Sequence, residues 1–352
     1  MSSNNEVCLV VPSIREKCLY DFIERWNKIK LFDVVDLLVV EDNDSKTFNL
    51  QGATCKLGHF SWEEIDAQLG DSSWIIPRRS DTVRSFGYYE AWKQGYKYVI
   101  TLDDDCYPTS EAEGITYDGR AFVNEHLKFM KGGLTKWHST LSNVKPRGIP
   151  YFNVGARRAV LNHGLWTNVL DYDAPTQLVN PAKEKFSFTT QVIPAGFYFP
   201  MCGMNVAFSR EIAVLTYHLM MGKSLGNNMT TKYLEVLPFD RFGDIWSGIF
   251  MKKIVDHLGL IVTSGLPYIH HERASNPFTN LKKEANGLEV NEFMWEHVDK
   301  LVLVGNDPVS CYEQLALHIA DFVVDYPKFS EYDDYFHTLG SAMSVWAGLF
   351  KE

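Results

Sequence analysis

The sequence predicts an α/β protein with a mixed sheet flanked by helices, and three observations lead to this expectation. Two short apolar runs rich in β-branched residues, 7–11 and 34–40, each end in turn-forming residues, which is typical of buried strands. The segment between them, 15–30, carries apolar residues at helical spacing. The same order recurs, with an expected helix at 85–95 and an expected strand at 96–102. Strand–helix–strand units of this length build parallel sheets.

The later part of the chain is expected to add loops, one helix–strand pair and a helical tail. The region 146–200 is rich in Pro, Gly and Asn and shows little periodicity, which predicts loops and short strands over a cleft. We expect a helix at 245–258 and then a strand at 259–263. After residue 310, two amphipathic patterns predict two C-terminal helices. The expected domains are a ligand-binding domain of residues 1–305 and a C-terminal helical extension of residues 306–352.

Charge and cysteine usage exclude several classes of protein. The 34 Lys and Arg residues against 44 Asp and Glu residues give a net charge of −10. Proteins that mainly hold a nucleic-acid backbone carry the opposite sign, so we expect no nucleic-acid partner. The six cysteines are scattered, without the spacing of a zinc finger or a disulfide scaffold. No apolar run approaches the roughly 20 residues of a membrane helix, and the N-terminus lacks secretory features. We therefore expect a cytoplasmic protein without a transmembrane segment.

The clearest local feature is the acidic triplet Asp103-Asp104-Asp105, which follows the expected strand at 96–102. In open α/β sheets, ligands bind at the carboxyl ends of the strands. On an extended segment, Asp103 and Asp105 would point to one side. Two carboxylates there suit a hard divalent cation such as Mg²⁺ or Mn²⁺, which would neutralise a departing nucleoside diphosphate. A solvated acidic turn is the alternative.

A second acidic strand end and a histidine pair are further candidates. Asp42 and Asp44 follow the strand at 34–40, where a carboxylate can accept hydrogen bonds from a base or ribose. Turn formation is the alternative for both aspartates. His270-His271 follow an apolar segment, and a histidine there is a candidate third metal ligand or phosphate contact. A structural role is the alternative for a lone histidine.

Arginines and aromatic loops supply candidates for the rest of a ligand. Arg15 and Arg84 lie in sequence near the acidic strand ends, and arginine binds phosphate bidentately. Two loops dense in aromatic and polar residues, 163–177 and 199–205, suit sugar recognition, with ordinary loop packing as the alternative. The sugar-binding candidates are His163, Trp166, Asp171, Asp173 and Asn205.

Seven longer stretches are more specific than these motifs. They are VVPSIRE (10–16), VVEDNDSK (39–46), RSFGYYEAWKQGYKYVITLDDDC (84–106), HGLWTNVLDYDAPTQLV (163–179), PMCGMNVAFSR (200–210), DIWSG (244–248) and DHLGLIVTSGLPYIHHERASNPFTNLKKE (256–284). They cover the chain from about residue 7 to 285, with a weaker match in the C-terminal helices. On these stretches the chain resembles the reversibly glycosylated polypeptide family, whose active plant members are UDP-arabinopyranose mutases.

The resemblance implies a glycosyltransferase-A-like α/β fold, a UDP-sugar ligand and a divalent metal, typically Mn²⁺, with Mg²⁺ as the other candidate. It assigns metal binding to Asp103, Asp105 and His271. Asp244 matches the second acidic residue of a family D-D-M-W segment, and Gly243 replaces the first. The candidates for the nucleotide are Arg15, Asp42, Asp44, Arg84, Asp103 and Asp104, of which the resemblance implies Asp42, Asp44 and Asp103.

One departure from the family concerns an arginine. The family becomes glycosylated on an arginine in an L-R-E-G segment upstream of H-G-L-W, and the ungapped count places Val154 there in this chain. Arg157 and Arg158 lie three and four positions further on and are the candidates to replace it. A guanidinium is charged at pH 7 and is a poor nucleophile without a neighbouring carboxylate. Asp244 is the candidate for that carboxylate.

The resemblance therefore implies a metal-dependent UDP-sugar pyranose/furanose mutase with reversible self-glycosylation on arginine, in a homo- or hetero-oligomer. Three alternatives stay open. The first is a glycosyltransferase or a stably self-glycosylating protein. The second is a non-catalytic partner subunit of an active relative, which the shifted arginine favours. The third is a general metal-dependent hydrolase, which fits the aspartates but not the long loop matches.

Overall fold

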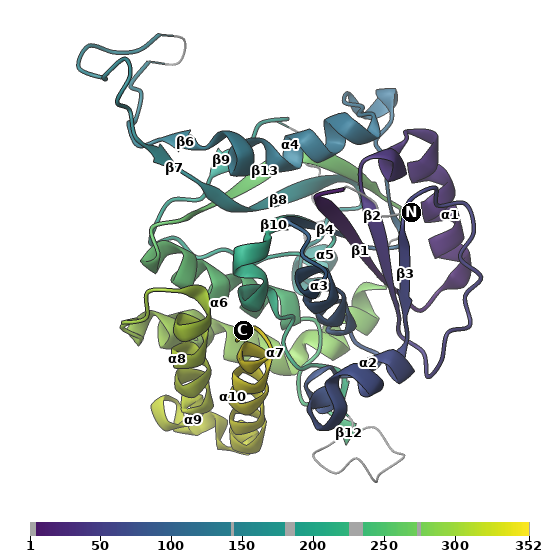
Figure 1. The fold of residues 1–352 in the computed structure, drawn as a ribbon. Helices are drawn as coiled ribbons and strands as arrows, with labels where there is room; N and C mark the ends of the chain where they lie inside the picture. Colours follow the sequence, from purple (N-terminus) through teal and green to yellow (C-terminus); the bar gives the residue numbers. More distant parts are fainter. Residues whose placement is uncertain (1–4, 142–143, 180–186, 225–234, 273–275, 352) are drawn as a thin grey trace.

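The protein is built around one large mixed sheet with helices on both faces (Figure 1). The structure is a computed structural model that describes residues 5–141, 144–179, 187–224, 235–272 and 276–351. Within these ranges, nine strands form the central sheet in the order β3-β2-β1-β4-β10-β8-β13-β5, with β9 also paired to β13. The expected fold class, a mixed sheet flanked by helices and followed by C-terminal helices, is confirmed.

The strands of the sheet are β1 (Val7–Ser13), β2 (Asp36–Glu41), β3 (Leu57–Phe60), β4 (Tyr98–Leu102), β5 (Cys106–Tyr107), β8 (Ala159–Asn168), β9 (Gln191–Val192), β10 (Asn205–Ser209) and β13 (Ile261–His271). Two small two-stranded sheets pair β6 (Leu134–Thr135) with β7 (Ala156–Arg157) and β11 (Lys223–Ser224) with β12 (Glu235–Val236). The α-helices are α1 (Glu16–Lys28), α2 (Trp62–Leu69), α3 (Val83–Lys93), α4 (Gly119–Gly132), α5 (Ala174–Val179), α6 (Gly243–His257), α7 (Pro277–Lys300), α8 (Pro308–Ala320), α9 (Phe322–Asp325) and α10 (Asp333–Gly348).

The parallel part of the sheet explains the continuous apolar runs of the sequence. β1 lies between β2 and β4 and is parallel to both. All six residues of β2 are buried, because helices cover both faces of a parallel sheet. Val10 faces Leu38 of β2 and Thr101 of β4. The three strands therefore end at the same edge of the sheet.

Two hydrophobic cores lie on opposite faces of the sheet. One contains Trp26 of α1 and Phe122 of α4, whose rings are 4.7 Å apart. The other contains residues of α3, α6, α8 and α10, including Phe86 and Trp246. Alternate residues of β1 divide between the cores, Val10 in one and Val11 in the other, as the two-residue period of a strand requires.

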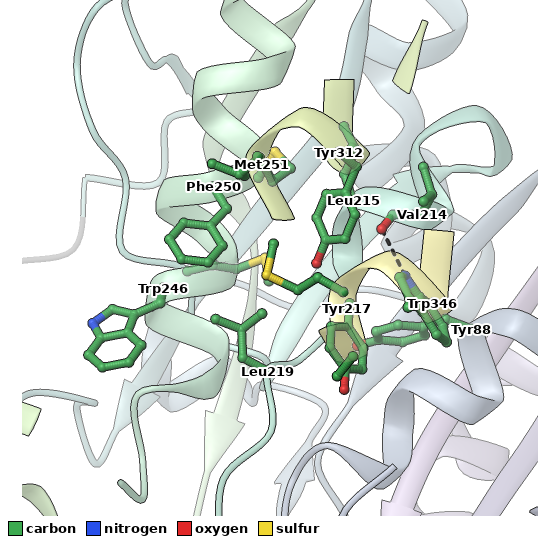
Figure 2. Close-up of a cluster of buried hydrophobic side chains, with 14 of the residues drawn as sticks. Tyr88, Val214, Leu215, Tyr217, Leu219, Trp246, Phe250, Met251, Tyr312 and Trp346 are labelled. Carbon is green, nitrogen blue, oxygen red and sulfur yellow. Dashed lines mark hydrogen bonds between the residues drawn. The ribbon is translucent and has the colours of Figure 1, made fainter. Parts of the chain in front are cut away.

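The C-terminal helices are part of the larger core. Trp346 of α10 is fully buried, stacks on Tyr217 at 5.0 Å, and donates its indole N–H to the Val214 carbonyl oxygen at 2.8 Å. Figure 2 shows this hydrogen bond among the surrounding side chains, which come from α3, α6, α8, the 3₁₀ turn at 210–216 and the residues that follow it, Tyr217 and Leu219. The domain boundary predicted between residues 305 and 306 stays a prediction. Side chains on both sides of it share one hydrophobic core, and this shared core does not mark a boundary.

Several local expectations need correction. The region 146–200 contains β8, a ten-residue strand in the middle of the sheet, where we expected only short strands. The strand expected at 259–263 extends to His271. The helix α7, with 24 residues, was not predicted. Of the helices that the structure describes, none has both the length and the apolar character needed to cross a membrane.

Candidate active site

The candidate site lies where β1, β2 and β4 end. Ser13, the last residue of β1, faces Glu41, the last residue of β2. The acidic triplet 103–105 follows β4 directly and forms a turn, in which the Cys106 amide donates to the Asp103 carbonyl oxygen at 3.1 Å. The alternation expected for an extended segment therefore does not apply to the triplet. After the turn, β5 pairs with the end of β13, which places His271 opposite Cys106.

Asp105 and His271 form the part of the site that suits a cation. The Nε2 atom of His271 lies 3.9 Å from Oδ1 of Asp105. The other ring nitrogen, Nδ1, lies 2.9 Å from the carbonyl oxygen of Val169, and a carbonyl can only accept. Nδ1 therefore carries the proton in the neutral ring, which leaves the lone pair on Nε2, the nitrogen 3.9 Å from Asp105. A carbonyl partner of this kind orients metal-binding histidines.

Arg15 and Ser13 organise the other carboxylates at this end of β1. Asp104 is 2% exposed and accepts from the Ser13 hydroxyl at 2.5 Å and from Nε of Arg15 at 3.2 Å. Nη2 of Arg15 also contacts Asp104 and lies 3.0 Å from Oδ2 of Asp105. Burial raises the pKa of Asp104, although Ser13 and Arg15 oppose this. We refer to Ser13, Arg15, Asp104, Asp105 and His271 as the Arg15 cluster.

Arg84, on α3, organises a second group of carboxylates beside the first. Its Nη2 lies 2.5 Å from Oδ1 of Asp103, and its Nε donates to Oδ1 of Asp81 at 2.7 Å. Its Nη1 donates to the carbonyl oxygen of Gly203 at 2.5 Å. The Arg84 side chain is 3% exposed, so these contacts replace its hydration. Asp103 thus turns toward Arg84, while Asp105 turns toward Arg15.

His218 and Asp244 complete this second group. Nδ1 of His218 lies 2.5 Å from Oδ2 of Asp81, and its Nε2 is buried without a hydrogen-bond partner. Oδ2 of Asp244, at the start of α6, accepts from the Gly203 amide at 3.0 Å. We refer to Asp81, Arg84, Asp103, His218 and Asp244 as the Arg84 cluster.

The two clusters differ in the acidity of their carboxyl groups. Burial raises the pKa of Asp103 to about 6, even though Arg84 opposes the shift. Burial likewise raises the pKa of Asp244 to about 6, with a further contribution from the charge of Asp81. Burial would also raise the pKa of Asp81, but Arg84 and His218 outweigh it and lower that pKa. The Arg84 cluster therefore holds two carboxyl groups that titrate near neutral pH.

The sugar-binding candidates fall into two sets. His163 is 4% exposed, and its Nε2 accepts from the Cys202 amide at 3.3 Å while its ring meets Trp166 edge-on at 5.5 Å. Burial lowers the pKa of His163 to about 4, so the ring is neutral at pH 7. Asp171 is exposed, and its charge acts on both Cys202 and Asp244. Asp171 is thus the sugar candidate whose charge reaches the Arg84 cluster, through Asp244, whereas Trp166 contacts the ring of His163.

Two other sugar candidates have structural tasks instead. Asn205 is fully buried, and its amide donates to the carbonyl oxygens of Leu165 and Pro267 at 3.0 and 2.9 Å. Its Oδ1 accepts from His126 at 2.9 Å, so the side chain has no surface for a sugar. Asp173 caps α5 by accepting from the Thr176 amide at 2.8 Å. Asn205 stands opposite Leu102, the residue before Asp103, but its side chain is fully used by the protein. Among the described residues, no hydrogen bond joins Asp173 to either cluster.

The aspartates predicted on the uridine side also have different places. Asp42 is 3% exposed and accepts from the Trp62 indole at 2.7 Å and from the backbone amides of Arg79 and Ser80 at 3.0 and 3.1 Å. It therefore holds the loop before α3 against the end of β2. Asp44 is exposed in the loop that follows. Of the two, only Asp44 keeps its carboxylate open to solvent.

Arg157 and Arg158 lie at the opposite edge of the sheet. Both arginines precede β8, and the register across β10 relates β8 to β4. His163 of β8 is level with Thr101 of β4, since both face Val206 of β10. In the same way, Leu161 is level with Val99, since both face Phe208. This register places Arg158 beyond the amino end of β4, and its Nη2 pairs with Glu211 at 2.6 Å. At about 3.3 Å per residue, the six residues from Arg158 to the level of Leu102 span about 20 Å. The expectation that either arginine lies beside Asp105 or Asp244 is not supported.

The donor set at Asp105 and His271 fits a divalent cation only in part. Among the described residues, no group of three or more His, Cys, Asp or Glu side chains is arranged to hold a metal ion. One carboxylate and one oriented imidazole are the protein share typical of a cation whose other ligands are nucleotide phosphates and water. The two residues therefore suit a metal that arrives with its nucleotide.

Sequence reasoning missed Ser13, Asp81 and His218. Asp81 stands three residues before Arg84 at the start of α3, and that spacing was available as a signal because i and i+3 are neighbours on a helix. His218 stands 137 residues after Asp81, and nothing local marks it. The pairing arises in the folded chain, where the His218 amide donates to Oγ of Ser85 on α3 at 3.0 Å and its ring meets that of Tyr88.

The chain is similar to plant proteins along its whole length. A profile described as "Reversibly glycosylated polypeptide" matches residues 2–352. UDP-arabinopyranose mutase 3 of Arabidopsis thaliana is 35% identical over 363 aligned positions, which cover 99% of this chain and 91% of that protein. UDP-arabinopyranose mutase 1 of Oryza sativa subsp. japonica is 34% identical with the same coverage.

Solved structures show a more distant likeness. Glucosyl-3-phosphoglycerate synthase from Mycobacterium tuberculosis, in complex with Mn²⁺, UDP and phosphoglyceric acid, has a TM-score of 0.40 and 13% identity over 90% of this chain and 78% of its own. Another structure of that enzyme has a TM-score of 0.41 and 13% identity over 86% of this chain and 83% of its own. These values are too low to carry a conclusion about this chain.

Proposed function

The chain belongs to the reversibly glycosylated polypeptide family, and from this premise we propose that it is a metal-dependent UDP-sugar pyranose/furanose mutase. Relatives named UDP-arabinopyranose mutase share 34–35% of its residues across 99% of its length. The observation that carries the proposal is the Asp105–His271 pair, which joins the ends of β4 and β13 at the carboxyl edge of the sheet. The sugar proposed is arabinose, as in the names of these relatives.

We propose that the diphosphate lies against the Arg15 cluster. The Arg15 side chain is 30% exposed and bridges Asp104 and Asp105. It can therefore turn from these carboxylates to a phosphate, while the Ser13 hydroxyl continues to satisfy Asp104. Arginine suits this exchange because its planar fork matches carboxylate and phosphate equally.

A divalent cation, Mn²⁺ or Mg²⁺, held by Asp105 and His271 would neutralise the charge that develops on the departing diphosphate. The chain's own share is to select the tautomer of the neutral His271 ring through the Val169 carbonyl oxygen, so that Nε2 is the nitrogen available to a cation. Asp103 stays on Arg84 and adds negative charge next to the cation site. We propose that the triplet is divided between two arginines for this reason: Asp105 is left to bind the cation, while Asp103 stays paired with Arg84.

The Arg84 cluster is the proposed place of the sugar. A mutase must hold the sugar while its ring opens and recloses, and hydroxyl protons must be taken up and returned in that process. The carboxyl groups of Asp103 and Asp244, with pKa values raised to about 6 by burial, suit that exchange near neutral pH. Trp166 and Asp171 would contact the sugar from the β8 side.

The test is turnover by the purified chain. Incubation with UDP-arabinopyranose and Mn²⁺, followed by chromatography and NMR of the nucleotide sugar, should yield UDP-arabinofuranose. The conversion should stop when the metal is chelated and in the Asp105→Ala variant. Intact UDP binding without any isomerised sugar in the wild-type chain would contradict the mutase proposal.

Reversible self-glycosylation is proposed separately, and mass spectrometry after the same incubation tests it. Sugar that is removed by excess UDP supports the reversible route, whereas sugar that stays supports a stably self-glycosylating protein or transferase. UDP release with neither modified protein nor isomerised sugar would support hydrolysis. The distance of Arg157 and Arg158 from the clusters argues against both as acceptors.

That same distance favours a second candidate function, a non-catalytic partner subunit of an active relative. The ungapped count places Val154 at the family's arginine position, and Arg157 and Arg158 lie beyond the amino end of β4, away from both clusters. This candidate predicts UDP binding without turnover by the pure chain, together with a stable complex with an active relative. Turnover by the chain alone would exclude it.

A further inference from the structure

The ring of His218 has one nitrogen that the protein uses and one that it does not. Nδ1 lies 2.5 Å from Oδ2 of Asp81. Burial would raise the pKa of Asp81, but Arg84 and His218 outweigh it, so this carboxylate is ionised and only accepts. Nδ1 therefore carries the proton of the neutral ring, and the lone pair is on Nε2. Among the described residues, no group donates to Nε2, although His218 is only 1% exposed.

A buried acceptor without a donor costs free energy, because it has lost its hydration without gaining a partner. Such atoms are few in folded proteins, and a catalytic role is one of the reasons for which they are kept. The ring also lies close to the surface, since the side chain of Asp81 is 43% exposed. His218 thus has the arrangement of a general base: a carboxylate orients one ring nitrogen, and the opposite nitrogen is left for a substrate.

Gly203 brings Asp244 and Arg84 next to this ring. A Cβ atom on Gly203 would lie 2.7 Å from Cε1 of His218 and 3.0 Å from Nη1 of Arg84, so any larger residue there would displace the imidazole. The Gly203 amide donates to Oδ2 of Asp244 at 3.0 Å, and its carbonyl oxygen accepts from Nη1 of Arg84 at 2.5 Å. The backbone of one glycine therefore holds two members of the Arg84 cluster beside a third.

His218 and Asp244 are neighbours that do not bond to each other. Burial raises the pKa of Asp244 to about 6, and the charge of His218 opposes that rise. Within the described part of the chain, no hydrogen bond or ion pair joins the two side chains. One hydroxyl oxygen with a hydrogen bond on each side spans about 5–6 Å. A hydroxyl between them would donate to Nε2 of His218 and accept from the neutral carboxyl of Asp244.

We propose that His218 binds a hydroxyl of the sugar through Nε2 and is a catalytic base of the ring change, with Asp244 as its acid. This inference rests on the proposed mutase function and names the residues that move its protons. Asp81 then has a separate task, because its ionised carboxylate stabilises the imidazolium that forms when His218 takes up a proton.

The change from pyranose to furanose requires one proton to arrive and one to leave. The bond from C1 to the pyranose ring oxygen breaks with its electron pair on that oxygen, which takes a proton from Asp244. The 4-hydroxyl oxygen gives its proton to Nε2 of His218 and bonds C1 with a lone pair, which closes the furanose. The proton on His218 then passes back to the Asp244 carboxylate. Both residues regain their first state, and no oxidant or reductant is needed.

Two substitutions separate the two nitrogens of His218. In His218→Asn the amide N–H takes the place of Nδ1, so the bond to Asp81 stays and Nε2 is lost. In His218→Gln the amide takes the place of Nε2 and still binds a hydroxyl, but it cannot take up a proton. With UDP-arabinopyranose and Mn²⁺, kcat should fall at least about 100-fold in both variants. KM should rise only in His218→Asn, and the affinity for UDP should change less than about twofold in either variant.

His337→Asn is the matched control and should keep the wild-type kcat. His337 also faces an aspartate, Asp333 at 3.6 Å, but its side chain is 56% exposed on α10. Wild-type kcat in either His218 variant would overturn this proposal and leave the mutase function standing. A wild-type chain that binds UDP-arabinopyranose without turnover would instead contradict the proposed function, and the base role of His218 with it.

Nitrogen NMR of the unmodified chain, labelled at histidine, needs no variant and no turnover. The Nε2 signal of His218 should move when UDP-arabinopyranose is added, because a sugar hydroxyl then donates to it. UDP alone should leave the signal in place. A signal that does not move with the sugar nucleotide, or that moves equally with UDP, would overturn the contact between His218 and the sugar.

Discussion

The Arg15 cluster and the Arg84 cluster are built from the same residue types at the same edge of the sheet, yet their arginines differ in exposure. The side chain of Arg15 is 30% exposed, and that of Arg84 is 3% exposed. Arg15 contacts two carboxylates of the triplet, and Arg84 contacts the third together with Asp81. The triplet is thus divided between a partly solvated arginine and a buried one.

The difference teaches that a shared motif does not imply a shared task for its members. A partly exposed arginine can exchange one anion for another at little cost, because water replaces lost contacts. A buried arginine cannot, because removing its partners leaves an uncompensated charge. We infer that the Arg15 cluster exchanges ligands while the Arg84 cluster keeps its shape.

The largest expected effect is on stability, from Arg84→Met. This change leaves Asp81 and Asp103 without their cation and should lower the free energy of unfolding by about 3 kcal/mol. The value is at the low end for a buried ion pair because Asp81 is 43% exposed. Denaturant titration measures it, and Arg158→Met is the control, since its pair with Glu211 is exposed and should cost no more than about 0.5 kcal/mol. Equal losses in both variants would remove the contrast between a buried and an exposed arginine.

The next effect is on binding, from Asp105→Ala in the Arg15 cluster. With Mn²⁺ present, UDP affinity should fall about 100-fold, or about 2.7 kcal/mol. The reason is that the proposed cation site, Asp105 and His271, loses its carboxylate and keeps only the imidazole. Calorimetry with and without Mn²⁺ measures the change. Glu272→Gln is the control, since the Glu272 side chain is 49% exposed and pairs with Arg25. Unchanged affinity in Asp105→Ala would refute the assignment of this site.

A smaller effect concerns pH and sharpens the description of the Arg84 cluster. Because burial raises the pKa of Asp244 to about 6, its ionised form destabilises the folded chain. The destabilisation is absent below pH 4, grows between pH 4 and 6, and is complete above that. Asp244→Asn should therefore stabilise the chain by about 1–2 kcal/mol at pH 7.5 and not at pH 4. Calorimetric unfolding at both pH values measures this, and a gain of equal size at pH 4 would show that ionisation is not the cause.

The smallest effect is expected at the far edge of the sheet. Arg157→Lys/Arg158→Lys should change UDP affinity less than twofold, because both residues lie about 20 Å along β8 from the clusters. Calorimetry measures the affinity, and mass spectrometry of the wild-type chain after incubation with UDP-sugar should find neither residue modified. Sugar on either residue would show that β8 or its preceding loop moves on binding.

Part of the site could be predicted from local sequence because its causes are local. The triplet 103–105 follows an apolar strand whose side chains are buried on both faces of the sheet. The carboxyl ends of parallel strands lie on the same side of a sheet, where ligands bind. Arg15 and Asp104 meet because β1 and β4 are adjacent parallel strands. Strand identity and strand order thus account for most of the Arg15 cluster.

Other features depended on partners distant in the chain. β8 escaped prediction because its ten residues include Asn162, His163 and Gly164, and their polar groups are satisfied only by neighbouring strands and α4. Asn205 looked like a sugar ligand by composition, but its amide is used by the carbonyls of Leu165 and Pro267. His163 and Asn205 were thus assigned to a ligand, although the protein itself supplies their hydrogen-bond partners.

By itself, the sequence determined the first strand–helix–strand unit, the strand that precedes the acidic triplet, and the family resemblance, because apolar periodicity and local turn chemistry act over a few residues. Only the tertiary structure decided which carboxylate meets which arginine, that His271 faces Asp105, and that Arg157 and Arg158 lie at the opposite edge. Those pairings follow from the register of the strands and the packing of α3, which bring Arg15 to Asp104 across 89 positions and His271 to Asp105 across 166. Sequence spacing does not reveal such distances. Arg158 and His163 are only five residues apart in the chain, but the extended strand β8 separates them along the sheet.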